Sequence, residues 1–261
     1  MRLLALDTAT SAITVAAHDG TTVLAARSVE DARHHTEHLA PTIEAVLGDA
    51  GWSPRALSDI VVGTGPGPFT GLRVGIVTAL TLGHATGARV HGVCSLDALA
   101  RAAREAHPQE TEVLVATDAR RREVYWARYR DGERVEGPGV ARAAELPDAL
   151  RALPTVGRGP LLYPDALAHP LTAPGRPLLD VDAAALARVA VDGIRAGSPM
   201  PTTPLYLRRP DAQEPGAPKS ATSPSPGRPT ASRASTSTAA TTATEAPATR
   251  NPAASSNTQS P

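Results

Sequence analysis

The order in which the hydrophobic period changes along the N-terminal part of the chain is what most constrains the fold. Apolar or β-branched runs occupy Leu3–Asp7, Ala12–His18 and Thr21–Ser28, and Asp19-Gly20 between the last two is a strong hairpin signal. Three short strands in succession predict an antiparallel meander.

Helical and strand-like segments then alternate. Apolar residues at helical spacing run over Leu39–Ala50, and a strand is expected at Ile60–Gly63. A helix from Leu72 to about Thr86, a strand at Arg89–Val93 and a helix opening at Ser95 follow. The order βββαβαβα predicts an α/β fold with a mixed sheet covered by helices.

The second half begins again with strands, at Glu112–Thr117 and Glu123–Arg130, and Asp131-Gly132 forms a turn. Prolines break the helical pieces of residues 142–200, and one longer helix is expected over Asp182–Arg195. This half is smaller and less regular than the first.

Domain organisation follows from these patterns and from one change in composition. From residue 211 to residue 261 the chain contains no Val, Ile, Leu, Met, Phe, Tyr or Trp. A segment of this kind buries too little apolar area to offset its chain entropy. We expect an N-terminal subdomain over 1–105, a smaller C-terminal subdomain over 106–210, and a disordered Ala/Ser/Thr/Pro-rich tail over 211–261.

Charge and composition exclude several classes of function. The chain has 261 residues and a formal net charge of zero, so no global field attracts it to nucleic acid or membrane. A single cysteine, Cys94, fits a reducing compartment, and no apolar run is long enough for a signal peptide core or a membrane span. We expect a cytoplasmic protein. Lys219 is the only lysine, so residues 1–210 offer none for a P-loop or a Schiff base.

The glycine-rich stretch GTGPGPFTGLRVG at 63–75 does not match the known phosphate-binding patterns. The pattern G-x-G-x-x-G fails in both frames, at Pro68 and at Thr70, and no lysine is present. Pro66 and Pro68 also remove two backbone donors. The stretch is better interpreted as a rigid turn that sets where the next helix starts.

That next helix carries small residues at a spacing of four. Such a stripe lets another backbone approach closely, although each glycine within a helix costs about 0.5–1 kcal/mol relative to alanine. A neighbouring stripe is apolar. One side can cover the sheet, and the other needs a partner, either the Leu39–Val46 helix or another protein. The two stripes consist of Gly71, Gly75, Ala79 and Gly83, and of Leu72, Ile76 and Leu80.

Two further stretches could hold a metal or a phosphate. His34, His35 and His38 have helical spacing, but no third distant ligand is evident, and a solvated helix start is the better interpretation. Asp7, Thr8 and Thr10 follow the first strand. They could hold Mg²⁺ and phosphate, or equally form a turn in which Asp and Thr side chains bond the backbone.

One short stretch is strongly basic. Arg120, Arg121 and Arg122 lie between two expected strands. They are interpreted either as a charged loop or as a basic patch for tRNA phosphates or an acidic partner.

Several stretches together resemble the bacterial TsaB (YeaZ) family, the dimerisation subunit of the tRNA threonylcarbamoyladenosine-modifying complex. They run in order over residues 2–209, and GPGPFTGLR followed by SLDALA is the most specific match. Pro68 is a departure, because the family more often has Ser there. The matching stretches are LLALDTATSAITVA, HHTEHLAPTIEAVL, DIVVGTGPGPFTGLRVGI, GVCSLDALA, DARRREVYWARY and PLYLRR.

The resemblance implies an actin/Hsp70-like (ribonuclease H-like) fold of two related mixed-sheet halves, the second degenerate. It also implies similarity to the catalytic subunit TsaD, which transfers threonylcarbamoyl to the adenosine beside the tRNA anticodon. That subunit carries H-x-x-x-H metal ligands where this chain has Ser95 and Leu99. The resemblance therefore implies a non-catalytic subunit with no metal site, and the alternative is an enzyme, either a transferase or a metallopeptidase-like relative.

The partners implied are TsaD, the ATPase TsaE, and tRNA through the complex, with a homodimer as an option when TsaD is absent. No tightly bound cofactor is implied, and any ATP would be held by partner subunits in the assembled complex. Asp7, Thr8 and Thr10 become candidates for a vestigial phosphate site. We expect the two helices singled out above to form or support the contact with TsaD, through Leu39, Ile43, Val46, Leu47, Gly71, Leu72, Gly75, Ile76, Ala79, Leu80 and Gly83.

Overall fold

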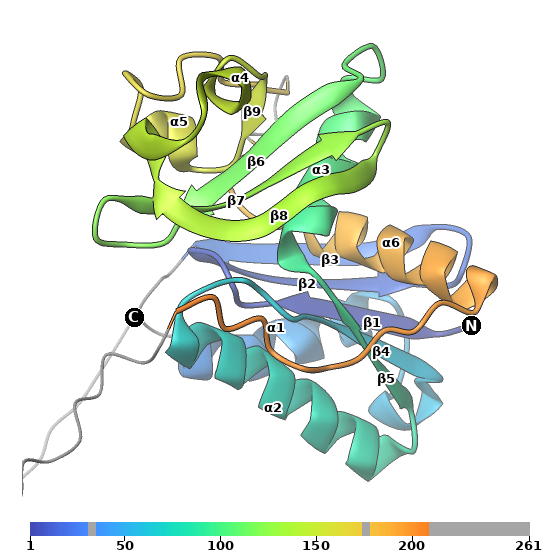
Figure 1. The fold of residues 1–261 in the computed structure, drawn as a ribbon. Coiled ribbons are helices and arrows are strands. Elements are labelled where there is room, and N and C mark those ends of the chain that lie inside the picture. The colour runs from blue at the N-terminus through green and yellow to red at the C-terminus, as the bar shows by residue number, and fades with distance from the viewer. Residues whose placement is uncertain (31–34, 174–177, 209–261) are drawn as a thin grey trace, which may run out of the picture. The chain divides into compact units, whose positions relative to one another are not determined.

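The first sheet has five strands in the order β3-β2-β1-β4-β5 (Figure 1). The structure is a computed structural model and describes residues 1–30, 35–173 and 178–208, so the predicted tail lies outside it. β1, β2 and β3 pair antiparallel, and β4 and β5 continue the sheet in parallel from β1. The predicted meander and mixed sheet are confirmed. The strands are β1 Leu3–Asp7, β2 Ala12–His18, β3 Val23–Glu30, β4 Asp59–Gly63 and β5 Arg89–Val93.

The helices of this half also match the periodicity in the sequence. α1 spans His35–Asp49, α2 spans Phe69–Thr86 and α3 spans Ser95–Ala106, with a short η1 at Pro54–Ala56. α2 ends where Gly87 adopts φ +79° and donates its N–H to Gly83, because glycine enters the left-handed region without a steric penalty.

The second sheet repeats the plan of the first with one strand fewer. Its order is β8-β7-β6-β9, with β6, β7 and β8 antiparallel and β9 parallel to β6. The arrangement is that of an actin/Hsp70-like fold with two related halves, the second degenerate, as predicted. The strands are β6 Glu112–Asp118, β7 Glu123–Arg130, β8 Glu133–Arg142 and β9 Thr155–Val156.

β8 was not predicted from the sequence. It contains Gly137, Pro138 and Gly139, which are unfavourable in strands, and it is the outer strand of its sheet. The outer position tolerates proline because one side of the strand needs no ladder hydrogen bonds.

The C-terminal part contributes short helices and one long one. They are η2 Ala143–Glu145, α4 Asp148–Arg151, α5 Gly159–Leu162 and α6 Ala183–Ala196. The Asp182 carboxylate caps α6 by accepting hydrogen bonds from the N–H groups of Ala184 and Ala185. Although the sequence assigned this helix to the C-terminal subdomain, α6 packs with α3 against residues of β1, β2 and β4. Residues 106–210 are therefore not a self-contained subdomain.

The buried residues of the first sheet divide between its two faces. Leu4 and Leu6 of β1 face α1 and α2, whereas Leu3 and Ala5 face α3 and α6, as the alternation of side chains along a strand requires. Figure 1 shows α1 and α2 on one side of this sheet and α3 with α6 between the two sheets. A separate cluster around Leu114 fills the outer face of the second sheet.

The small-residue stripe of α2 faces the sheet, not a partner. An added Cβ on Gly75 would overlap the Thr8 hydroxyl oxygen, and one on Gly83 would overlap the side chain of Val90. Ala79 is fully buried, and the Gly71 carbonyl accepts a hydrogen bond from Thr8. The stripe is therefore the side of α2 that covers the sheet, and close packing on that sheet leaves no space at Gly75 and Gly83 for a partner.

Gly75→Ala is expected to destabilise the fold by about 1–3 kcal/mol, because the methyl group must displace the Thr8 side chain or lift α2. The matched control is Gly48→Ala in α1, where an added Cβ meets nothing within 4 Å. That substitution should stabilise by about 0.5–1 kcal/mol through helix propensity. Urea unfolding midpoints measure both, and an equal response of the two variants would contradict this packing.

Candidate functional site

A buried carboxylate joins the ends of β1 and β4 to the start of α3. The Ser95 hydroxyl donates to Asp7 Oδ2 over 2.5 Å, and the Ala9 N–H donates to Asp7 Oδ1 over 2.7 Å. The Gly65 N–H in turn donates to Ser95 Oγ. Complete burial raises the pKa of Asp7 to about 6, although these two hydrogen bonds oppose the shift.

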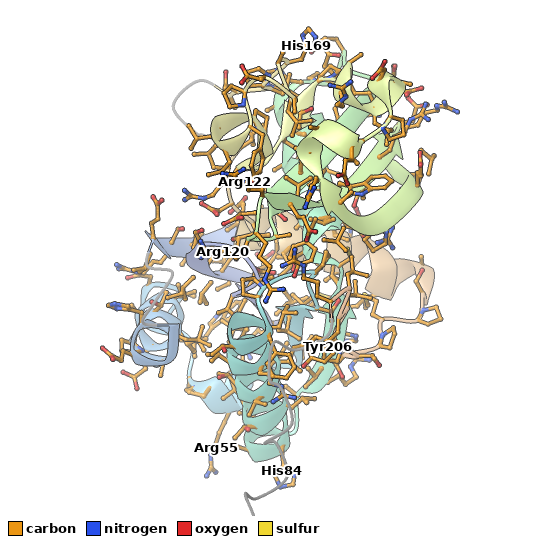
Figure 2. All side chains as sticks on the ribbon, turned by 60° about the vertical axis from the view of Figure 1, so that its left-hand side comes forward. Arg55, His84, Arg120, Arg122, His169 and Tyr206 are labelled. Atoms are coloured by element: carbon orange, nitrogen blue, oxygen red, sulfur yellow. The ribbon has the colours of Figure 1, made fainter. Side chains whose placement is uncertain are left out.

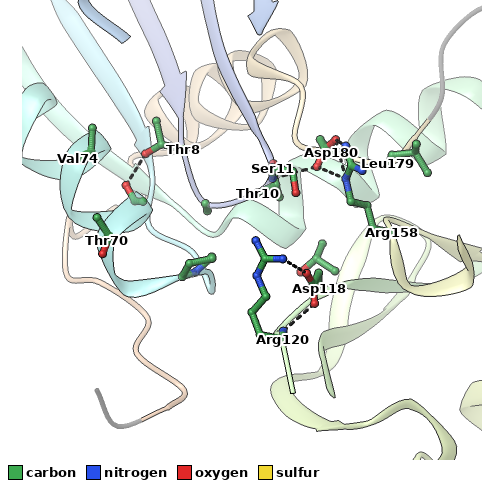
Figure 3. A pocket seen from close by; sticks show the side chains of 14 residues that line it. Thr8, Thr10, Ser11, Thr70, Val74, Asp118, Arg120, Arg158, Leu179 and Asp180 are labelled. Atoms are coloured by element: carbon green, nitrogen blue, oxygen red, sulfur yellow. Dashed lines mark hydrogen bonds and ion pairs between the residues drawn. The ribbon is translucent and has the colours of Figure 1, made fainter. Parts of the chain in front are cut away.

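A small cavity of about 130 Å³ opens at the residues that directly follow Asp7, Thr8 to Ser11 (Figure 3). It lies between the β1–β2 turn, the N-terminus of α2 and the second sheet, and a typical pocket for a ligand of nucleotide size is about 300–1,000 Å³. It is therefore too small to enclose a nucleotide. The residues that line it include Thr8, Thr10, Pro68, Thr70, Asp118, Arg120, Arg158 and Asp180.

The candidate phosphate ligands are engaged in internal hydrogen bonds. Thr8 Oγ1 donates to the Gly71 carbonyl over 2.7 Å, and Thr10 Oγ1 accepts from the Val181 N–H over 3.4 Å. Asp7 bonds the backbone two residues on and does not line the cavity. Asp7 thus makes the local turn contact that one interpretation expected, whereas the Thr8 and Thr10 hydroxyls bond backbone groups distant in sequence. A vestigial phosphate site at these residues stays a prediction.

An ion-pair cluster at the rim of the cavity was not predicted from the sequence. Arg158 pairs with Asp180, with Nη2 and Oδ2 2.6 Å apart, and also with Glu30 at the end of β3. These hydrogen bonds, that to Asp180 first, raise the pKa of Arg158 above its usual range. The three residues are far apart in sequence, and no local motif marks them.

The arginine stretch forms a tight loop between β6 and β7. Arg120, Arg121 and Arg122 are exposed and have φ angles of +61°, +52° and +64°. Asp118 holds the loop, because its Oδ1 accepts the Arg120 N–H over 2.7 Å and its Oδ2 lies 3.1 Å from Arg120 Nη1. Figure 3 shows this pair beside the cavity.

No metal centre is evident in the described residues. They contain no group of three His, Cys, Asp or Glu side chains placed to hold a metal ion. Ser95 and Leu99, at the expected ligand positions, are fully buried, and Ser95 is bound to Asp7. Burial also raises the pKa of the Cys94 thiol to about 12. Of the predicted histidine cluster, His34 and the side chain of His35 lie outside the described residues.

An apolar groove runs between α1 and α2 on the side of these helices that faces away from the sheet. Val77 exposes 58% of its surface there, and the indole of Trp52 is half-buried in the groove. Among the residues that line the groove, Glu44 is the one with an acidic side chain. The lining residues are Ala40, Ile43, Glu44, Leu47, Gly48, Trp52, Pro54, Val77, Thr78, Thr81, Leu82 and Ala85.

The predicted interface residues divide sharply by burial. Leu80 is 44% exposed, whereas Leu39, Ile43, Val46 and Leu47 are at most 7% exposed. The remaining predicted residues of α2 are buried too, so within the monomer they pack beneath the exposed surface of the two helices, and the expectation that they form or support the contact stays a prediction. The buried set in α2 is Gly71, Leu72, Gly75, Ile76, Ala79 and Gly83.

Comparison with known proteins identifies the family. A Pseudomonas aeruginosa protein described as similar to the peptidase YeaZ is 30% identical, with a TM-score of 0.66, over 79% of this chain and 99% of that one. The chain belongs to the TsaB (YeaZ) family. YeaZ from Pseudomonas aeruginosa itself gives 29% identity and a TM-score of 0.64 over the same shares.

The relatives place the TsaB family in tRNA modification. The Escherichia coli tRNA threonylcarbamoyladenosine biosynthesis protein TsaB is 39% identical over 133 residues, which is 51% of this chain and 57% of that protein. An uncharacterized Mycobacterium tuberculosis protein is 47% identical over 214 residues, 81% of this chain and 93% of that one. Residues 27–153 match the family model of TsaD, tRNA N6-adenosine threonylcarbamoyltransferase. The general role of the TsaB family is thus threonylcarbamoyladenosine biosynthesis.

No helix in the described part of the chain is both long and apolar enough to cross a bilayer. The predicted cofactors and the residues of any interface remain predictions.

Asp7→Asn is expected to change how stability depends on pH. Because burial raises the pKa of Asp7 to about 6, the protonated form is favoured in the folded state, and wild-type stability falls as pH rises from about 4 through 6. The Asn variant lacks this loss, so it should gain on the order of 3 kcal/mol relative to wild type between pH 4 and pH 7. Urea unfolding at both pH values measures the difference.

Asp165→Asn removes an exposed carboxylate and serves as the control, with no comparable gain expected. A constant stability difference between wild type and Asp7→Asn across this pH range would contradict the raised pKa.

Proposed function

We propose that the chain is a non-catalytic partner subunit that binds a TsaD-type catalytic subunit in the transfer of threonylcarbamoyl to the adenosine next to the tRNA anticodon. Membership of the TsaB family supports the pathway. The partnership and the absence of catalysis are argued from the residues below.

The α1–α2 groove is the observation that carries the partnership. Val77 lines the groove with 58% of its surface exposed, beside apolar residues of α1 and the half-buried Trp52, and Leu80, outside the groove lining, is 44% exposed on the same helix. Exposed apolar side chains that gather in one place on a soluble protein mark an interaction site. A helix pair from a partner subunit would cover these side chains, helix packed on helix.

The nature of the partner follows from the fold. A TsaD-type subunit that shares this fold would present an equivalent helix pair, and the two pairs could pack face to face. A second copy of this chain carries the same surface, so a homodimer is the competing use of the groove in the absence of the catalytic subunit. TsaE and tRNA would join the resulting heterodimer, with any ATP held by partner subunits.

The positions that would carry the chemistry support a non-catalytic role. Leu99 cannot ligate a metal, and the Ser95 hydroxyl is committed to Asp7. The cavity that Thr8 and Thr10 line is too small for a nucleotide. The alternative, an enzyme in its own right, would need a site that these residues do not supply.

Val77→Glu is expected to weaken binding to a TsaD-type subunit by about thirtyfold or more, because it would bury an unpaired charge at the centre of the interface. The matched control is Val135→Glu on β8, where an equally apolar side chain is 49% exposed on the second sheet. Isothermal titration calorimetry with the purified catalytic subunit measures both. Equal affinities for the two variants would contradict the proposed interface.

The purified chain alone is expected to transfer no threonylcarbamoyl to tRNA, whereas addition of a TsaD-type subunit restores the transfer. The measurement is incorporation of labelled threonine into tRNA, with metal content determined on the same samples. Transfer by the chain alone, or a stoichiometric metal ion that activity requires, would favour the enzyme alternative.

A further inference from the structure

Arginine and aromatic side chains from three separate parts of the chain meet near the N-terminus of α2. They come from α2 itself, from the β6–β7 loop and from the final described segment, residues 197–208. We call them the arginine–aromatic surface, which consists of Phe69, Arg73, Arg120, Arg122, Tyr206 and Arg208.

The aromatic part is held in a fixed arrangement. The rings of Phe69 and Tyr206 have centroids 5.1 Å apart, and the Arg73 guanidinium lies 3.6 Å from the Phe69 centroid. Arg73 Nε also donates to the Tyr206 hydroxyl over 3.3 Å. Tyr206 nevertheless remains 42% exposed, so part of a pre-positioned ring is open to a ligand.

The loop part presents guanidinium groups from a rigid turn. Arg120 and Arg122 adopt the left-handed region that usually favours glycine, and Glu123 closes the turn by donating its N–H to the Arg120 carbonyl. A backbone outlier held by such contacts is a reason to look for a function. Both side chains are exposed, and Arg120 lines the cavity described above.

Two contacts bring these parts together. Arg208, two residues after Tyr206, forms an ion pair with Glu123, which directly follows Arg122. Arg120 lines the same cavity as Thr70, the neighbour of Phe69 in α2. Figure 2 shows Arg122, Arg120 and Tyr206 following one another from the loop down to α2.

We propose that the arginine–aromatic surface binds the tRNA, with phosphates on the arginines and an unstacked base on Tyr206. This rests on the proposed function, since the tRNA would reach the surface in the complex with the catalytic subunit. Four arginines here, with Asp118 and Glu123 as the paired carboxylates, leave an excess of positive charge for phosphate. An exposed tyrosine beside arginines is the arrangement that holds single-stranded bases.

The observations favour RNA over two other possible ligands, an acidic protein segment and the chain's own residues 209–261. An acidic protein segment would satisfy the arginines but gives no reason for the open tyrosine ring. The chain's own residues 209–261 carry five cationic and three acidic side chains, so they supply no net negative charge.

The test measures tRNA affinity of the assembled complex by fluorescence anisotropy with a labelled unmodified tRNA transcript, over a series of salt concentrations. The double variant Arg120→Gln/Arg122→Gln is expected to bind roughly tenfold more weakly at about 0.1 M salt, with a lower slope of log K against log salt. Tyr206→Ala should weaken binding about fivefold or more with an unchanged slope, and Tyr206→Phe should retain it.

The matched control is Arg104→Gln/Arg130→Gln, which removes two exposed arginines at the opposite end of β7. Analytical ultracentrifugation of every variant with the catalytic subunit separates the two proposals. An intact complex whose tRNA affinity is unchanged by the Arg120→Gln/Arg122→Gln and Tyr206→Ala variants overturns the RNA assignment.

Two further outcomes also overturn it. If the variants of the arginine–aromatic surface no longer bind the catalytic subunit but bind tRNA as the wild-type chain does, the surface is a contact for that subunit and not for RNA. If the wild-type chain forms no complex at all, the proposed function fails, and the tRNA assignment falls with it.

Discussion

The hydrogen bond from Ser95 to Asp7 ties together the three segments on which the first half of the structure depends. Asp7 ends β1, Ser95 opens α3, and the same hydroxyl accepts the N–H of Gly65 from the turn after β4. There is room for the carboxylate only because Gly63 has no side chain, since an added Cβ would overlap Asp7 Oδ2. At Ser95, where the sequence resemblance implied a metal ligand in a catalytic subunit, this chain has a buried polar contact that stabilises the fold.

Close approach of backbone elements is used again in α2. The glycines at 75 and 83 bring this helix onto the first sheet, and Gly67 in the preceding turn lies against the backbone of Ala9. The side of α2 toward the sheet is consequently filled, and the apolar residues that remain, Val77 and Leu80, face solvent. The exposed groove is thus a consequence of how tightly the small-residue stripe packs inside the monomer.

The two surfaces proposed for function lie on α2 but are chemically different. The groove beside α1 is apolar and suited to a helical partner, whereas the N-terminal end of α2 carries Phe69 and Arg73 within the arginine–aromatic surface. One helix would therefore connect a protein contact with an RNA contact. The small cavity that carries the Arg158–Asp180 ion pair adjoins the arginine–aromatic surface, because Arg120 lines it, and it shares no lining residue with the groove.

Local pattern in the sequence was enough to determine the element order. Strand alternation, helical spacing and turn residues act over a few neighbours, so the βββαβαβα order and the end of α2 at Gly87 could be predicted, whereas the role of Asp7 was left between two alternatives. β8 could not be predicted, because its glycines and proline are compatible only with an edge strand. Whether a strand lies at the edge depends on the whole sheet. The family resemblance rested on the same local motifs.

Tertiary structure alone decided which faces are free. The stripe at Gly71, Gly75, Ala79 and Gly83 has the same spacing whether it meets a sheet or a partner, so the sequence could not choose between them. Only the packing showed that the sheet occupies it, that α6 returns to the first sheet, and that Arg208 and Tyr206 reach the β6–β7 loop and α2. Such contacts join residues that are distant in sequence, and no local periodicity encodes them.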